Sequence, residues 1–234
     1  SDAVNATTSV AGKTFTLTAN ADIFDLVTAV AANVTTNNDD TFRALSDGDL
    51  GNADLIDGAG GSDVMNVNMT EGAAPVTVQP QLTSVETINV TTTAIAGDNT
   101  TTLNLADSTG TTAVNVNVVD DFDFTVAGIT TATATTFIGA ATADTEAAVT
   151  LTGLSATADG GQDAYTVGLN NADLGVLTVA GVETLTLNAS GADTDIAVLT
   201  AAALEKLVIT GGSSDASVTT EDTQIGSGTA VNFA

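Results

Sequence analysis

The stretch LTSVETINV (residues 82–90) decides the fold, because its pattern recurs as VAGVETLTL (179–187) and AAALEKLVI (201–209). In each copy an apolar residue precedes a Glu, and apolar residues follow that Glu at the second and fourth positions. Because successive side chains of a strand point to opposite faces, the pattern predicts three strands, each with its Glu at the rim of a buried apolar face. Glu183 and Glu205 lie 22 residues apart, a suitable length for one coil of a β-solenoid.

A longer duplication encloses these copies. GSDVMNVNM (61–69) matches GQDAYTVGL (161–169), which makes Asp63 and Asp163 equivalent. The duplication predicts two related halves, residues 1–135 and 136–234. They form either two units or one continuous stack.

Apolar and polar residues alternate in several short segments, which favours strands of a half-buried sheet. These segments are residues 14–18, 66–69, 103–105, 114–118, 122–126 and 149–151, separated by turns rich in Gly, Asp, Asn and Ser. The predicted fold class is therefore all-β, an irregular β-solenoid with Gly/Asp-rich turns. One helix is predicted over residues 21–32, where Ile23, Val27 and Val30 follow helical spacing behind Asn20 as a cap, although so apolar a run also suits a buried strand.

The composition limits the partners of the chain. Its 234 residues include 3 basic and 29 acidic residues, a formal net charge of −26, so nucleic acid and anionic lipid are disfavoured while divalent cations are attracted. The apolar fraction of 43% favours a folded chain, and no apolar run is long enough to insert in a membrane. The chain contains no Cys, so extracellular stability would have to come from packing or metal ions. It begins at Ser1 without a signal segment, as expected of a fragment or a processed product.

The residues that most enzymes use are scarce. There is no His and no Cys, which excludes the Ser-His-Asp triad, Cys-His dyads and common zinc sites. Lys13, Arg43 and Lys206 are the only cations available to stabilise a phosphate or an oxyanion. Paired carboxylates remain, as in glycosidases, but the aromatic platforms that usually accompany them are missing. We therefore expect no enzymatic activity.

The glycine-rich turns point to calcium. GAGGSD (58–63) is a degenerate form of the Gly-Gly-x-Gly-x-Asp nonapeptide, whose turns present carbonyl and carboxylate oxygens to the ion. ADGGQD (158–163) repeats the arrangement. An ordinary solvated acidic turn is the alternative. The candidate calcium residues are Asp49, Asp54, Asp57, Gly58, Gly60 and Asp63 in the first half, and Asp159, Gly161 and Asp163 in the second.

The other acidic residues have simpler interpretations. Asp22, Asp25, Asp39, Asp40, Asp120, Asp121 and Asp123 are expected in solvated loops. The rim residues Glu86, Glu183 and Glu205 are expected to accept backbone N–H bonds from a neighbouring coil rather than to bind an ion.

The VETINV and VETLTL strands, the DGAGGSD turn, the Thr/Ala/Asp-rich composition and the lack of Cys resemble bacterial surface-layer proteins of the repeats-in-toxin type. Large calcium-dependent adhesins share this style. The resemblance implies calcium-stapled β-solenoids, secreted to the cell surface, that assemble with copies of themselves into a lattice. It assigns the calcium role to Asp57 and Asp63, and also to Asp159 and Asp163. Tandem nonapeptides are absent, so isolated calcium sites fit better than a regular calcium β-roll.

Three functions follow from these observations. The first is a structural module of an extracellular surface layer, held by calcium and in contact with copies of itself through the solenoid ends. Cell-surface polysaccharide would be bound by other parts of the chain. The second is a stalk or binding module of a large adhesin, and the third a carbohydrate-active β-helix enzyme.

Overall fold

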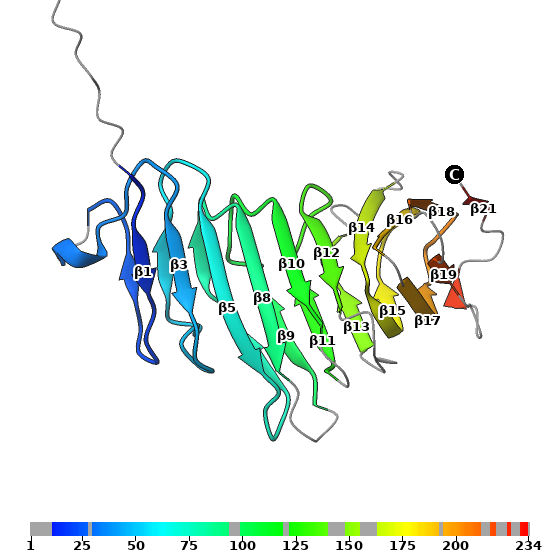
Figure 1. Ribbon diagram of the computed structural model, residues 1–234, viewed down its shortest axis with the longest axis horizontal. Coiled ribbons are helices and arrows are strands. Elements are labelled where there is room, and N and C mark those ends of the chain that lie inside the picture. Colours follow the sequence, from blue (N-terminus) through cyan, green and yellow to red (C-terminus); the bar gives the residue numbers. More distant parts are fainter. Residues whose placement is uncertain are drawn as a thin grey trace, which may run out of the picture.

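The computed structural model describes residues 11–27, 30–93, 99–118, 122–139, 148–154, 163–191, 194–211, 216–218, 224–225 and 230–233. They form a parallel β-solenoid, as the sequence predicted. Figure 1 shows the strands side by side along the long axis of the molecule, from β1 at one end to β21 at the other. Every described strand pair is parallel.

Three sheets form the sides of the solenoid. The ten-stranded sheet contains, in spatial order, β1 (Thr14–Thr16), β3 (Thr41–Ala44), β5 (Val64–Thr70), β8 (Thr87–Thr93), β10 (Ala113–Asn117), β12 (Ala134–Ile138), β14 (Ala164–Asn170), β16 (Thr184–Ser190), β18 (Lys206–Gly211) and β21 (Ala230–Phe233). The eight-stranded sheet contains β6 (Val76–Val78), β9 (Thr101–Asn104), β11 (Phe124–Ala127), β13 (Ala148–Leu151), β15 (Asp173–Val179), β17 (Thr194–Ala201) and β19 (Ala216–Val218), with β20 (Gln224–Ile225) also on β17. The three-stranded sheet contains β2 (Ile23–Phe24), β4 (Leu55–Asp57) and β7 (Gln81–Thr83).

The three repeated segments are strands of the same sheet. β8, β16 and β18 each begin one residue after the Glu of the repeat. Their second and fourth residues, such as Ile88 and Val90, face the core as predicted. β12 pairs with β10 on one side and β14 on the other, so the sheet is continuous across residues 135 and 136.

The core is built from columns of side chains, because register pairs equivalent positions of successive coils. One inward column consists of Phe15, Phe42, Met65, Ile88 and Val114. Phe42 is fully buried, and its ring centroid lies 5.2 Å from that of Phe15 and 5.9 Å from that of Phe24. This aromatic group fills the core between the first two described coils.

The outward faces also carry columns. Asn66, Asn89 and Asn115 are in register on β5, β8 and β10, and their side-chain amides bond one another at 3.0 and 2.9 Å. On the eight-stranded sheet a continuous column contains Thr77, Thr102, Thr125, Thr150, Thr178 and Thr200. Short polar side chains therefore cover both faces, while most described acidic residues lie at strand ends and in turns.

The helix predicted over residues 21–32 is wrong. Its first part contains β2, and in the described residues of this range the only helical turn is the 3-10 helix η1 (Ala31–Asn33). Ile23 pairs with Leu55 of the next coil, and Phe24 enters the aromatic group, so coil stacking prevails over helical spacing. Within the described ranges, helical structure nowhere reaches the length and apolar character that crossing a bilayer needs.

The aromatic group gives a test of this core. Phe42→Ala should lower the free energy of unfolding by about 3–5 kcal/mol, since it leaves a cavity under the first coils. Val76→Ala, at a site where the side chain is 38% exposed, is the control and should cost far less. Urea unfolding followed by circular dichroism measures both, and equal losses would contradict the assigned core.

Candidate functional site

A ladder of carboxylates runs along the start of the first strands of the ten-stranded sheet. The Oδ1 atom of Asp40 accepts the N–H of Lys13 at 2.6 Å, and Oδ1 of Asp63 accepts the N–H of Asp40 at 2.6 Å. The Oε2 atom of Glu86 then accepts the N–H of Asp63 at 2.7 Å. Each acid thus binds the backbone of the preceding coil at the position just before a strand. We call Asp40, Asp63 and Glu86 the carboxylate ladder.

The same geometry recurs in the second half of the chain. The Oε2 atom of Glu183 accepts the N–H of Asp163 at 2.7 Å. The equivalence of Asp63 and Asp163 is therefore structural, and Glu86 and Glu183 confirm the predicted role of the rim Glu residues as backbone acceptors. Glu205 continues the column, and its N–H donates to the carbonyl of Glu183.

Asp63 is the most unusual member of the ladder. Its side chain is fully buried, and its Oδ2 atom has no hydrogen-bond partner. Burial raises the pKa of Asp63 to about 6, the N–H of Asp40 opposes that rise, and the charges of Glu86, Asp40 and Asp39 add to it. A buried carboxylate oxygen without a partner is costly, so a proton or a cation would stabilise it.

The glycines of the turn make room for this oxygen. A Cβ atom at Gly58 would collide with the Ser84 carbonyl oxygen and with Asp63 Oδ2. Gly61 has φ +120°, and a Cβ there would lie 2.5 Å from the carbonyl carbon of Asn38 in the preceding coil. Both glycines are therefore required by the close approach of successive coils. The Ser84 carbonyl oxygen and the unpaired Asp63 oxygen therefore both lie close to Gly58.

Asp54 plays a similar part on the three-stranded sheet. It is buried, and its two oxygens accept the N–H groups of Asp22 at 2.9 Å and of Gly51 at 2.7 Å. Burial raises the pKa of Asp54, these two hydrogen bonds lower it, and the charge of Asp22 raises it further. In the next coil, Pro80 occupies the position opposite Asp54. Proline has no backbone N–H, so the following coil needs no carboxylate to accept one at this position.

The remaining candidate calcium residues do not join Asp63 in one cluster. Asp49 accepts the N–H of Ser46 at 2.8 Å, and Asp57 accepts the N–H of Ala59 at 2.9 Å, both within their own turns. Gly60 lies beside Asn37. Across the part of the chain that the structure describes, no three acidic side chains come together in a way that could hold a metal ion. Asp159 and Gly161 lie outside the described residues, as do Asp120 and Asp121.

Sequence reasoning missed Asp40, which was expected in a solvated loop. It is 1% exposed, and its Oδ2 atom also accepts the N–H of Thr36 at 2.7 Å. Its position one residue before a strand, as in Asp63, was the available signal. Asp123, also expected to be solvated, accepts the N–H of Ala148 in the next coil at 2.9 Å. Asp39 is exposed, as predicted.

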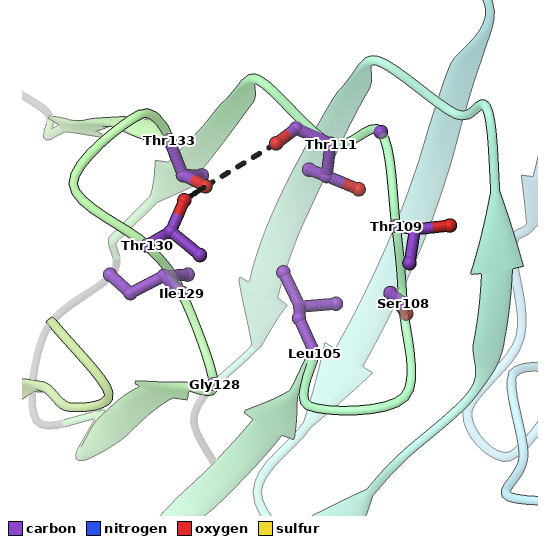
Figure 2. Close-up of a pocket in the computed structure, with 9 residues that line it drawn as sticks. Leu105, Ser108, Thr109, Thr111, Gly128, Ile129, Thr130 and Thr133 are labelled. Carbon is purple, nitrogen blue, oxygen red and sulfur yellow. Dashed lines mark hydrogen bonds between the residues drawn. The ribbon is translucent and has the colours of Figure 1, made fainter. Parts of the chain in front are cut away.

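A cavity of about 250 Å³ lies between two turns on the third side of the solenoid, beyond β7. Figure 2 shows Thr130 and Thr133 facing Thr111 across it, above Leu105 and Ile129. Thr133 donates to the carbonyl of Thr111 at 3.3 Å, and Ser108 donates to that of Pro80 at 3.1 Å. These hydroxyl groups link successive coils by hydrogen bonds. The cavity is therefore a gap between the turns of two coils, and its lining residues carry no charge.

Comparison with known proteins gives no match: no family model, curated protein or solved structure is similar to this chain. The fold defines the chain as a parallel β-solenoid. Its function has to be argued from the carboxylate ladder and from the surfaces of the solenoid.

The raised pKa of Asp63 predicts a pH effect on stability. Its folded pKa of about 6 lies above the ordinary value of 3.8, so the folded state binds the proton more tightly and stability falls as the pH rises between these values. Asp63→Asn keeps an oxygen for the Asp40 N–H and carries no charge. In the presence of a chelator, it should raise the melting temperature at about pH 8 and change it little at about pH 4.

Asp123→Asn is the matched control, because it removes one carboxylate that also accepts a backbone N–H between coils. Scanning calorimetry over a pH series measures the difference between the variants. An Asp63→Asn chain that is less stable than the wild type at about pH 8 would contradict the conclusion that the wild type buries an unpaired charge at Asp63.

Proposed function

We propose that this chain is a structural module of an extracellular bacterial surface layer, stabilised by calcium and assembled with copies of itself. The observation that carries the proposal is the buried, unpaired oxygen of Asp63 within a ladder of carboxylates. Calcium prefers carboxylate and carbonyl oxygens, and Asp63 Oδ2 and the Ser84 carbonyl converge at Gly58. These two oxygens are the groups that would hold the ion.

The chemistry that calcium supplies here is charge compensation. Asp63 lies among the charges of Glu86, Asp40 and Asp39, in a chain with a net charge of −26. A cation that binds the folded state alone stabilises it by mass action. Sites with few charged ligands bind calcium in the range of 10⁻⁴–10⁻³ M, which is typical of extracellular modules.

The faces of the solenoid support a packing role. On the eight-stranded sheet, the acidic residues within the strands are Asp173, at the first residue of β15, and Asp195 of β17, which is paired with it in register. The other described outward positions carry short Thr, Ala, Val, Gly and Asn side chains. Such a face can lie against neighbouring molecules with little charge to desolvate. The acidic strand ends and turns would then be bridged by calcium.

The enzyme alternative lacks a matching observation. The cavities near Leu105, Met69 and Tyr165, of about 250, 20 and 360 Å³, are lined mainly by Thr, Gly and apolar residues. Asp47 is the one charged side chain that lines them. A glycosidase would need two carboxylates facing each other across a groove.

Calcium should raise the melting temperature. At a free concentration one hundred times the Kd, mass action adds about 2.7 kcal/mol, or about 5–10 °C for a chain of this size. Asp63→Asn should lose most of this shift, while Asp123→Asn should keep it. Thermal unfolding in calcium and in chelator measures both. Equal wild-type melting temperatures in the two buffers would overturn the calcium role.

A stalk module of a calcium-dependent adhesin is the second candidate, and the elongated stack of coils favours it equally (Figure 1). Electron microscopy of purified chain across a calcium titration separates the two. The surface-layer module should give extended sheets that disperse in chelator. Isolated rods at every calcium concentration would favour the adhesin stalk.

A further inference from the structure

The apolar surface of the described chain is concentrated at its N-terminal end. Seven large apolar side chains are exposed among the described residues, and six of them belong to the first coil or to its direct neighbour. Three of these six, which we call the end patch, lie between β2 and η1: Leu26 (43% exposed), Val27 (87%) and Val30 (55%). Soluble proteins rarely gather exposed apolar residues in this way without a partner surface.

The segment that carries the end patch is held in place. The Nζ atom of Lys13 donates to the carbonyl of Val34 at 2.6 Å, the N–H of Thr35 to the carbonyl of Asp25, and the side-chain amide of Asn33 to that of Ile23. Figure 1 shows the dark-blue coil of η1 beyond β1, at the end of the solenoid. The apolar residues are thus presented at the end of the stack by hydrogen bonds to the first coil.

The end patch adjoins an open sheet edge. β1 is the terminal strand of the ten-stranded sheet, and β2 is the terminal strand of the three-stranded sheet. The carbonyl of Lys13 and the N–H of Leu17 bond to β3, so strand alternation directs the N–H groups of Thr14 and Thr16 away from it. Among the described residues nothing pairs with that edge. An open edge of this kind accepts another strand.

The opposite end of the same sheet supplies the matching edge. β21 is the last strand of the ten-stranded sheet, it runs parallel to the others, and within the described part of the chain it pairs with β18 alone. A second copy placed end to end would set its β21 beside β1 in the parallel direction that every coil already uses. Lys13 and Arg43, two of the three basic residues, lie on or beside β1 and β3, and they offset part of the negative charge that Asp22 and Asp25 bring to this end.

We propose that the N-terminal end binds the C-terminal end of a second copy, so that β21 of one molecule extends the sheet at β1 of the next and the end patch is buried between them. The contact is heterologous and does not close, so it produces linear filaments. This inference rests on the proposed self-assembly and names its surface. Calcium would join filaments side by side, whereas the end contact uses backbone and apolar groups.

Two variants of the full chain test the contact, each with a matched control. Thr16→Pro removes an N–H from the open edge, and Thr16→Ala keeps it. Val27→Glu places a charge in the end patch, and Thr166→Glu places the same charge at an exposed position of β14, in the interior of the ten-stranded sheet. Sedimentation velocity over a concentration series and negative-stain electron microscopy give the lengths of the filaments. Circular dichroism and melting temperatures show that each variant is folded.

The wild type, Thr16→Ala and Thr166→Glu should form filaments in chelator as well as in calcium. Val27→Glu should weaken association about tenfold or more, the effect of losing one buried apolar side chain, and Thr16→Pro should shorten the filaments. Wild-type chains that remain monomeric at every concentration would overturn the proposal that a second copy covers the end patch. They would assign the end patch to a contact within the same polypeptide. Folded Thr16→Pro and Val27→Glu chains that assemble like the wild type would also overturn the proposal.

The same samples separate this inference from the calcium proposal. A calcium-dependent melting temperature without end-to-end filaments would leave calcium binding in place and reject the end contact. Filaments that form although calcium does not change the melting temperature would support the end contact and reject calcium binding.

Discussion

The stacking of parallel coils in register is the constraint on which the rest of this structure depends. Neighbouring strands lie about 4.8 Å apart, so every position on one coil is repeated next to its equivalent on the following coil. Apolar positions gain from this repetition and form the inward columns of Phe, Met, Ile and Val. Acidic positions repel one another, and the residues of the carboxylate ladder offset part of that cost by accepting a backbone N–H from the preceding coil.

The carboxylate ladder also explains how an acidic chain can fold without many cations. A backbone N–H just before a strand has no partner from the sheet itself, and a buried N–H without an acceptor is costly. Asp40, Asp63 and Glu86 meet this need at the same corner of successive coils. The acids are therefore part of the architecture, and Asp63 is the member whose second oxygen is left for a proton or a metal ion.

The sequence predicts more of the fold than of the candidate site. Alternation and the VET repeats predict the strands, the parallel stack and the rim Glu residues, because strand parity depends on local pattern alone. The site depends on register, and coil length varies: linked positions are 20 residues apart at Asp163 and Glu183 but 32 apart at Thr133 and Tyr165. Without the register between coils, the sequence does not show that Asp40 bonds to another coil whereas Asp49 bonds within its own turn. The acidic residues around the glycine turn therefore looked like one cluster.

The helix predicted over residues 21–32 failed for the same reason. Its apolar spacing is genuine, but Phe24 is the residue that enters the core, and Ile23, Val27 and Val30 remain exposed. A periodicity argument assigns these residues to one buried face. The structure instead gives one of them to strand pairing with Leu55 and leaves the others at the end of the stack.

The direction of the hydrogen bonds has a mechanical consequence. Sheet bonds in a parallel stack run along the long axis of the solenoid, from coil to coil. Tension along that axis therefore loads the coil interfaces in series and peels them apart one at a time, so that the weakest interface yields first. Tension across the axis loads all bonds of a strand together in shear, which requires far more force. A module of this construction resists stretching within the plane of its coils and extends by releasing single coils along its length.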